Sequence, residues 1–212
     1  MKSDRAGEIV SRLKRMYPKA ACSLDYHNPF ELLIATMLSA QSTDARVNIV
    51  SKTLFKKYPT AASMASAGQV DMEREVRTTG FFRNKAKAAI AASKAIMEKH
   101  GGDVPETMEE LVALPGVGRK TANVVLGNAF NKPVGVVVDT HVARVSGRLG
   151  LTAHDDPVRI EQDLMTLLPL KEWTRFAHRL ILHGREICVA RKPKCNECRL
   201  NELCPSAQEP LV

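Results

Sequence analysis

Apolar side chains recur every three or four residues along most of the chain, which is the pattern of helices that bury one face. The first apolar stripe runs from Ile9 to Met16 and stops at Tyr17-Pro18. The second begins after Asn28-Pro29, a capping residue followed by proline at the first helical position. The same pattern predicts further helices around residues 47–55, 60–67, 70–78, 84–100, 107–114, 119–131 and 140–149, from 156 onward, and over 173–187. Residues 134–138 form one β-like run without a partner, which we interpret as an extended connector, so the prediction is an all-α fold.

Composition narrows the class of protein. The 212 residues are 44% hydrophobic and 25% charged, which is ordinary for a folded chain with one large or two small domains. Thirty-one Lys and Arg residues against 23 Asp and Glu give a net charge of +8, which favours a polyanionic partner such as nucleic acid or an anionic membrane surface. A basic surface that serves only solubility has the same composition. No apolar run approaches the ~20 residues of a membrane span, and the polar N-terminus, which enters directly into a helical pattern, predicts no secretory signal.

Residues 114–121 read Leu-Pro-Gly-Val-Gly-Arg-Lys-Thr and lie between two predicted helices. Pro115, Gly116 and Gly118 allow a tight turn with positive φ angles, so the backbone can approach another molecule closely. The helix that begins near Arg119 directs unpaired amides and the positive end of its dipole at the same place. The stretch therefore predicts a phosphate-binding turn with Lys120 beside it.

Two residues are candidates for covalent chemistry. Lys120 lies next to Arg119 at a helix N-terminus, where loss of its proton is eased and the neutral amine is a nucleophile that forms Schiff bases. A lysine at a phosphate-binding turn is more usually a phosphate contact or a solvated charge, so its position alone favours that simpler interpretation. Asp139 follows the apolar run at the start of a helix, so it is either an N-cap or a partly desolvated carboxylate that stabilises positive charge on a sugar ring. The helix predicted from Arg119 is only about three turns long. If the extended connector over residues 134–138 returns the chain to the start of that helix, Lys120 and Asp139 line one cleft.

Four cysteines crowd into the end of the chain with the spacing Cys188-x6-Cys195-x2-Cys198-x5-Cys204. In a chain without a signal peptide, clustered thiols are better explained as metal ligands than as disulfides. Structural zinc usually uses two tight pairs of cysteines, whereas these wider gaps enclose a larger group. The spacing therefore favours a [4Fe-4S] cluster over zinc.

These motifs resemble those of the endonuclease III family of helix-hairpin-helix DNA glycosylases. The resemblance is carried in order by residues 38–44, 114–126 and 138–141, and by the cysteine loop after Leu182-His183-Gly184-Arg185. It covers essentially the whole chain and implies two helical lobes with a C-terminal iron-sulfur cluster loop. It also implies a helical barrel domain over 22–132 that carries the helix-hairpin-helix, and a cluster domain formed by 1–21 plus 133–212.

The resemblance also implies the roles of individual residues. Lys120 matches the family's Schiff-base lysine and Asp139 its catalytic aspartate, while the four cysteines match the cluster ligands. Gln41 matches a residue that fills the gap left by an extruded base, and Phe81 stands where the family usually places a leucine wedge. Phe81-Phe82 is thus a departure that leaves the range of lesions open. The remaining residues expected to contact DNA are Pro115, Gly116, Val117, Gly118, Arg119 and His141.

The activity implied is that of a bifunctional DNA glycosylase with AP lyase activity by β-elimination. Such an enzyme excises oxidised pyrimidines from duplex DNA in base excision repair, and binds DNA with damaged pyrimidines or abasic sites. A cytoplasmic, nucleoid-associated monomer without membrane contact is expected. The role of the cluster, structural first and redox second, is left open.

Three alternatives remain. An adenine-removing mismatch glycosylase is disfavoured, because that enzyme resembles a monofunctional hydrolase without a lysine at the position of Lys120 and carries an extra C-terminal domain. A mismatch-specific thymine glycosylase of the same superfamily fits the motifs. From a different class, a noncatalytic DNA-binding or redox protein would use the glycine turn only to hold phosphate and the cluster only to carry electrons.

Overall fold

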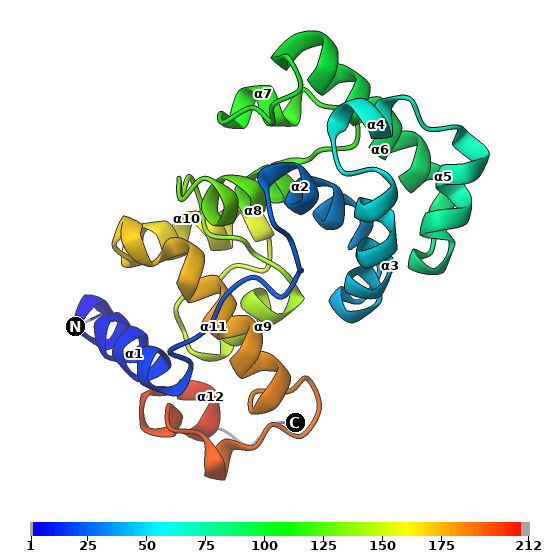
Figure 1. Cartoon of the computed structure of the whole chain (residues 1–212). Helices are drawn as coiled ribbons and strands as arrows, with labels where there is room; N and C mark the ends of the chain where they lie inside the picture. Colours follow the sequence, from blue (N-terminus) through cyan, green and yellow to red (C-terminus); the bar gives the residue numbers. More distant parts are fainter. Residues whose placement is uncertain (1, 209–212) are drawn as a thin grey trace. The chain divides into compact units, whose positions relative to one another are not determined.

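The computed structural model describes residues 2–208, with side chains over 4–207, and this part of the chain contains helices and no strand (Figure 1). The predicted all-α class is confirmed. No helix among the described residues is both long enough and apolar enough to cross a membrane. The α-helices are α1 (Lys2–Met16), α2 (Pro29–Leu38), α3 (Asp44–Lys57), α4 (Ala61–Ala65), α5 (Gln69–Val76), α6 (Phe82–His100), α7 (Met108–Val112), α8 (Arg119–Ala129), α9 (Thr140–Arg148), α10 (Pro157–Leu167), α11 (Trp173–Glu186) and α12 (Pro205–Gln208). Short 3-10 turns are η1 (Arg77–Thr79), η2 (Leu170–Glu172), η3 (Cys195–Glu197) and η4 (Asn201–Leu203).

Polar side chains start the helices where the sequence predicts them. The Asn28 side chain accepts a hydrogen bond from the Glu31 amide at 2.9 Å, and proline follows it at the first position of α2. Asp156 caps α10 in the same way through the Arg159 amide at 3.0 Å. Each cap satisfies one of the amides that a helix start leaves without a partner.

The chain divides into two compact units. The central unit comprises Cys22–Val134, and the terminal unit comprises the residues up to Ala21 together with those from Gly135 onward. Each unit has its own apolar core among the described residues. The core of one unit therefore forms from a continuous stretch, whereas that of the other requires the two ends of the chain to meet.

In the central unit, α2 lies in the middle of the core. Eight of its ten residues are buried, which fits a helix that is apolar on every side. It contacts α3, α6 and α8, and α6 also packs against α4 and α5. These contacts hold three turns within the same packed unit: the turn after α2, the turn before α6 and the turn before α8.

The terminal unit is built on α11, which packs against α1 and α9. Phe176 of α11 and both Ile9 and Leu13 of α1 are among its largest fully buried side chains. Gly184 lets α9 approach α11, because a Cβ there would come within 3.2 Å of His141 Cβ and of Val145 Cγ2. The close approach of these two helices brings the start of α9 and the end of α11 into one compact unit.

Candidate functional site

The glycine turn between α7 and α8 is closed by a hydrogen bond from the Val117 amide to the Leu114 carbonyl at 3.1 Å. Gly116 has φ +77, a conformation that side chains disfavour. A Cβ on Gly116 would also lie 2.8 Å from Ala88 Cβ and 3.1 Å from Met37 Cε. Glycine is therefore required here both for backbone conformation and for packing against α6 and α2.

Gly118 is the N-cap of α8, and its geometry differs from that of Gly116. Its φ is −97, and nothing among the described residues lies within 4 Å of a Cβ built there. No side-chain cap closes this helix start within the described part of the chain. Arg119 and Lys120 follow in the first turn and are exposed. Exposed amides, the helix dipole and two cations together make a site for an anion such as a phosphate.

Gln41 and Phe81 both have left-handed backbone conformations, with φ of 54 and 46. Such conformations cost about 1–3 kcal/mol at residues other than glycine and concentrate at functional sites. Phe81 is 64% exposed although it is large and apolar. Gln41 follows the end of α2 and Phe81 precedes α6, the two helices that contact the turn at Gly116. The central unit thus carries three of the predicted DNA-contacting segments on one set of packed helices, whereas His141 belongs to the terminal unit.

Lys85, which sequence reasoning missed, supports the turn before Phe81. Its ammonium group donates to the Thr79 carbonyl at 2.7 Å, and its amide donates to the Phe81 carbonyl at 3.1 Å. The side chain is buried, and this burial lowers the pKa of Lys85. It lies in a helix rich in alanine and lysine, where periodicity does not distinguish a buried lysine from its exposed neighbours.

Asp139 caps α9 in the terminal unit. Its Oδ1 atom accepts from the amides of His141 and Val142 at 2.9 and 2.8 Å, and its Oδ2 atom lies 3.1 Å from His141 Nδ1. The side chain remains 21% exposed. The carboxylate is therefore an N-cap, as one interpretation predicts, and its orientation is fixed further by His141, a bond that the sequence did not reveal.

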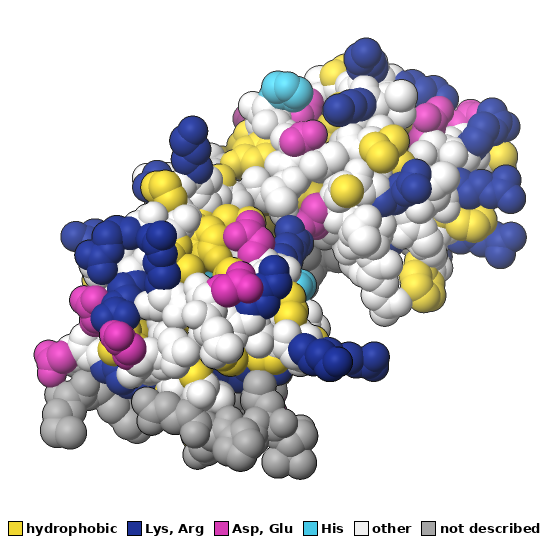
Figure 2. All heavy atoms as spheres, turned by 90° about the horizontal axis from the view of Figure 1, so that it is seen from below, with side chains coloured by type: hydrophobic (Ala, Val, Ile, Leu, Met, Phe, Trp, Pro, Cys, Tyr) yellow, Lys and Arg dark blue, Asp and Glu magenta, His cyan; other side chains and the backbone are white. Residues whose placement is uncertain are grey.

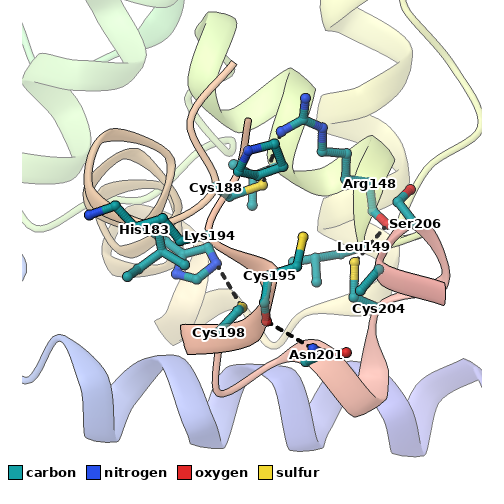
Figure 3. Close-up of a pocket in the computed structure, with 14 residues that line it drawn as sticks. Arg148, Leu149, His183, Cys188, Lys194, Cys195, Cys198, Asn201, Cys204 and Ser206 are labelled. Carbon is teal, nitrogen blue, oxygen red and sulfur yellow. Dashed lines mark hydrogen bonds between the residues drawn. The ribbon is translucent and has the colours of Figure 1, made fainter. Parts of the chain in front are cut away.

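The four cysteines of the C-terminal loop surround one space (Figure 3). They line a cavity with an empty volume of about 410 Å³, which includes its opening to solvent. Among the described residues no three His, Cys, Asp or Glu side chains are grouped as they would be around a single metal ion. Four thiols that enclose a volume fit a four-iron cluster better than they fit one zinc ion.

Burial raises the pKa of the Cys198 and Cys204 thiols, and the charges of neighbouring cysteines add to this effect. Metal binding at these residues must therefore displace protons, because a ligating cysteine is a thiolate. Cys198 also accepts a hydrogen bond from the Leu200 amide at 3.4 Å. Leu200 itself is completely buried in the core of the terminal unit, so it anchors the loop.

Two arginines of α9 hold the first part of the cysteine loop. Arg144 donates to the carbonyls of Gly184 and Cys188 at 2.9 and 3.2 Å. Arg148 donates to the Val189 carbonyl at 2.8 Å and lies 3.5 Å from Cys188 Sγ (Figure 3). The helix that begins at Asp139 is therefore bonded directly to the loop.

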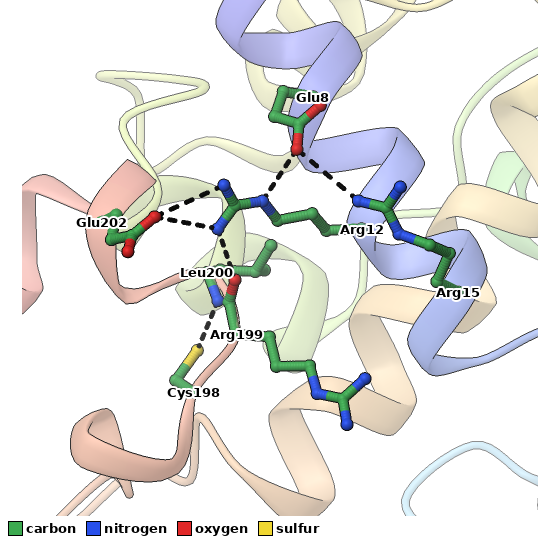
Figure 4. A network of polar contacts seen from close by, with 7 residues as sticks. All are labelled: Glu8, Arg12, Arg15, Cys198, Arg199, Leu200 and Glu202. Carbon is green, nitrogen blue, oxygen red and sulfur yellow. Dashed lines mark hydrogen bonds and ion pairs between the residues drawn. The ribbon is translucent and has the colours of Figure 1, made fainter.

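The N-terminal helix α1 holds the second part of the loop. Arg12 donates to the Arg199 carbonyl at 2.9 Å and pairs with Glu8 and Glu202 (Figure 4). Arg5 donates to the carbonyls of Leu149 and Leu203 at 2.7 and 2.9 Å. Residues from both ends of the chain are therefore required to shape the loop.

Comparison with known proteins agrees with these features. A family model of HhH-GPD superfamily base excision DNA repair proteins matches residues 34–170, and one of the iron-sulfur binding domain of endonuclease III matches residues 188–204. The chain is 56% identical to endonuclease III of Synechocystis sp. over 207 residues, covering 98% of this chain and 94% of that protein. It is 41% identical to endonuclease III of Escherichia coli K12 over 197 residues, covering 93% of each.

Solved structures give the same relationship. A trapped endonuclease III-DNA covalent intermediate, in its estranged-adenine complex, matches with a TM-score of 0.92 and 42% identity over 98% of both chains. A thermostable thymine-DNA glycosylase matches with a TM-score of 0.87 but 22% identity, which shows a shared fold alone. The iron-sulfur domain implies a [4Fe-4S] cluster as the cofactor. The chain belongs to the endonuclease III family of helix-hairpin-helix DNA glycosylases.

Proposed function

We propose that this chain, a DNA N-glycosylase with AP lyase activity, uses Lys120 as its nucleophile and Asp139 as the carboxylate that stabilises the reacting sugar. Its function is base excision repair of oxidised pyrimidines in duplex DNA. The observation that carries the assignment is the position of Lys120, which is exposed in the first turn of α8 immediately after the uncapped turn at Gly118. A phosphate bound by that turn would place a nucleotide beside the amine.

The turn and the exposed cations bind the DNA backbone without reading its sequence, which suits an enzyme that searches for damage. Figure 2 shows more Lys and Arg than Asp and Glu side chains on the face it displays, in keeping with the net charge of +8. Pro115, Gly116, Val117, Gly118 and Arg119 are assigned to this contact, with His141 near the carboxylate. Chemistry on a stacked base requires its extrusion, so Phe81 would enter the stack and Gln41 would fill the gap.

In the proposed reaction, the neutral Lys120 amine attacks C1′ of the damaged nucleotide while the base leaves with the electrons of the glycosidic bond. Asp139 stabilises positive charge on the sugar as this bond breaks. The product of this attack is an aminal, in which the nitrogen loses a proton, the C1′–O4′ bond breaks and O4′ takes up a proton, so that the sugar ring opens to a protonated imine. This imine makes the 2′ proton acidic, so its removal expels the 3′ phosphate by β-elimination. The mechanism requires both residues to reach the same sugar.

Cys188, Cys195, Cys198 and Cys204 are assigned as the ligands of the [4Fe-4S] cluster. When bound, the cluster supplies electron-transfer capacity and cross-links the loop. Other residues of the loop have separate roles: Lys192 and Lys194 add positive charge beside the cluster, and Leu200 anchors the loop in the core of the terminal unit.

We assign residues 1–21 plus 133–212 to the cluster domain, and 22–132 to the helical barrel domain. A monomer in the cytoplasm, associated with the nucleoid, completes the proposal.

The nucleophile is tested by borohydride reduction in the presence of duplex DNA that contains a single thymine glycol. We expect wild type to form a covalent adduct, and Lys120→Ala and Lys120→Arg to form none. The arginine variant keeps the positive charge, so it separates nucleophilic attack from phosphate binding. Lys99→Ala removes an exposed lysine of α6 and serves as the control that leaves the adduct intact.

An undiminished adduct with Lys120→Arg would remove Lys120 from this role. A mismatch-specific thymine glycosylase would instead act on duplexes with a G·T mismatch and leave thymine glycol in place. A noncatalytic binding protein would retard the same DNA without cleaving it.

A further inference from the structure

His183 lies between the N-terminal helix and the cysteine loop. It belongs to α11, and its side chain is 1% exposed. Its Nδ1 atom is 3.2 Å from the Tyr17 hydroxyl, just beyond the end of α1, and its Nε2 atom is 3.5 Å from Cys198 Sγ. The two rings meet edge to face with centroids 6.0 Å apart. Figure 3 shows the imidazole directed at the Cys198 sulfur.

The direction of the two hydrogen bonds of His183 follows from the ionisation state of Cys198 when that residue binds iron. A cysteine bound to iron is a thiolate, which accepts hydrogen bonds and donates none. His183 Nε2 must then carry a hydrogen, since a bare nitrogen facing a thiolate would be repelled. A ring with a single hydrogen leaves Nδ1 as the acceptor, so the Tyr17 hydroxyl donates to it. The exposed Glu186 carboxylate also lies near that hydroxyl and competes for its hydrogen.

We propose that His183 is a positioning residue that tunes the iron-sulfur cluster: its Nε2–H donates to the Cys198 thiolate, and Tyr17 fixes the tautomer that makes this possible. The inference rests on the proposed function in one respect, the assignment of Cys198 as a ligand. A donor to a ligand sulfur withdraws electron density and stabilises the reduced cluster, so the bond raises the reduction potential.

The four sulfurs have different surroundings. Cys198 faces two donors, His183 Nε2 and the Leu200 amide. Cys188 Sγ lies 3.5 Å from a guanidinium nitrogen of Arg148, whereas Cys204 Sγ lies 3.3 Å from the Arg148 carbonyl. Among these contacts His183 supplies a neutral side-chain donor, so its replacement removes a hydrogen bond to sulfur without changing a formal charge.

The test compares the reduction potentials of iron-loaded proteins by voltammetry, after the iron content of each has been measured. His183→Leu removes the donor, and we expect a more negative potential. His183→Gln places an amide N–H near the position of Nε2, and we expect its potential to return toward wild type. Tyr17→Phe frees the tautomer, so a smaller shift in the same direction is expected. Tyr26→Phe removes a hydroxyl that donates to the Asn128 carbonyl in the central unit, and should leave the potential unchanged.

A second measurement takes its main reading from wild type, so it remains informative even if a variant at a buried position does not load iron. Pulsed EPR of the paramagnetic cluster in protein labelled with ¹⁵N-histidine should show a nitrogen coupling in wild type that is lost in His183→Leu. Unchanged potentials in fully loaded His183→Leu and Tyr17→Phe would overturn the inference. If the His183 variants fail to load iron, an unchanged Tyr17→Phe potential together with no ¹⁵N coupling in wild type would overturn it.

Failure of the ligand assignment has a different signature. A Cys198→Ala protein that retained four irons and the wild-type spectrum would show that Cys198 is not a ligand, and the proposed function of the loop would fail. A Cys198→Ala protein that lost its cluster, combined with a wild type lacking the ¹⁵N coupling, would overturn the role of His183 alone.

Discussion

Asp139 combines the roles of helix cap and reacting carboxylate, and substitution can separate them. The amide oxygen introduced by Asp139→Asn would still accept hydrogen bonds from the amides of His141 and Val142, so this variant should change the free energy of unfolding by less than about 1 kcal/mol. Asp139→Ala loses the cap and should cost about 1 kcal/mol. Both lose the negative charge, and we expect base excision to slow by roughly 10²–10⁴-fold in each. Denaturant unfolding and single-turnover excision of thymine glycol measure the two effects.

Equal loss of activity in both variants at unequal stability would support the assignment. Activity that instead followed stability, with Asp139→Asn close to wild type, would reduce Asp139 to a cap.

Lys85 gives a pH-dependent prediction. Burial lowers its folded-state pKa below the ordinary value of 10.5, so between the two values the unfolded chain binds more protons than the folded chain. Stability from this group therefore rises with pH as the solution passes through the folded pKa toward pH 10.5. Lys85→Met keeps an apolar stem without a charge. We expect the stability of wild type relative to Lys85→Met to increase over that range in chemical denaturation.

The same variant removes the donor to the Thr79 carbonyl, which supports the turn at Phe81. Faster amide exchange over residues 79–82 in Lys85→Met would show the loss of this support. A stability difference that stays constant with pH would mean that the amine is hydrated in the folded state.

The roles and conformations of several single residues could not be predicted from the sequence pattern. Residue type and position left Lys120 open between nucleophile and phosphate contact, and only the family resemblance favoured the former. The left-handed backbone at Gln41 and Phe81 has no signal in the sequence, because such conformations are signalled by glycine and neither residue is glycine. The bond from His141 to Asp139 depends on a side-chain rotamer, which periodicity does not contain.

The turn between α7 and α8 contains two glycines, Gly116 and Gly118, whose substitution by alanine should have different effects. Gly116→Ala combines a positive φ with a contact 2.8 Å from Ala88 Cβ, so we expect a loss of about 1–3 kcal/mol of stability. Gly118→Ala meets nothing within 4 Å among the described residues and has an ordinary φ, so stability should change by less than about 1 kcal/mol. Its methyl group would instead stand at the exposed start of α8 and weaken DNA binding by roughly tenfold.

Thermal unfolding and titration of abasic-site duplex by fluorescence anisotropy distinguish the two variants. Wild-type affinity in Gly118→Ala would show that phosphate does not approach this helix start.

Helix boundaries were predictable where a side chain closes the helix start. The Thr107 hydroxyl accepts a hydrogen bond from the Glu110 amide at 3.3 Å at the start of the helix predicted over 107–114, and it donates to the Glu110 carboxylate. The helix predicted from Asn84 begins earlier, at Phe82, because its start is set by the turn at Phe81. The short turns η3 and η4 were not predicted. They lie in the cysteine loop, where four thiols and a few polar contacts, without an apolar repeat, determine the backbone.

At the scale of the whole molecule, hydrophobic periodicity could not show which helices share a core. The apolar stripes of α1 and α2 are both helical in period, yet they belong to different units. Only the resemblance predicted that the two ends of the chain form a domain together. Hydrophobic periodicity cannot predict this domain, because it is held together by contacts between residues far apart in the sequence. Arg5 and Arg12, for example, contact the cysteine loop.

Removal of iron should therefore affect the two units unequally. The cysteine loop contributes Leu200 to the core of the terminal unit and is bonded to α1 and α9, so release of the cluster loosens a segment on which that core depends. The raised pKa of Cys198 and Cys204 means that the released thiolates take up protons, which disfavours rebinding as the pH falls. We expect iron-stripped protein to lose amide protection in α1 and over residues 188–208, while α2, α6 and α8 keep theirs.

Hydrogen exchange with and without iron, read residue by residue, measures this difference, and the central unit serves as the internal control. Restored protection after cluster reconstitution would attribute the loss to the metal and exclude irreversible damage. Protection that persisted in α1 and the loop without iron would mean that Leu200 and the arginine contacts hold the terminal unit by themselves. In that case the cluster would have to be retained for a purpose other than structure, and the electron density at its sulfurs, which His183 is proposed to control, would become its most informative property.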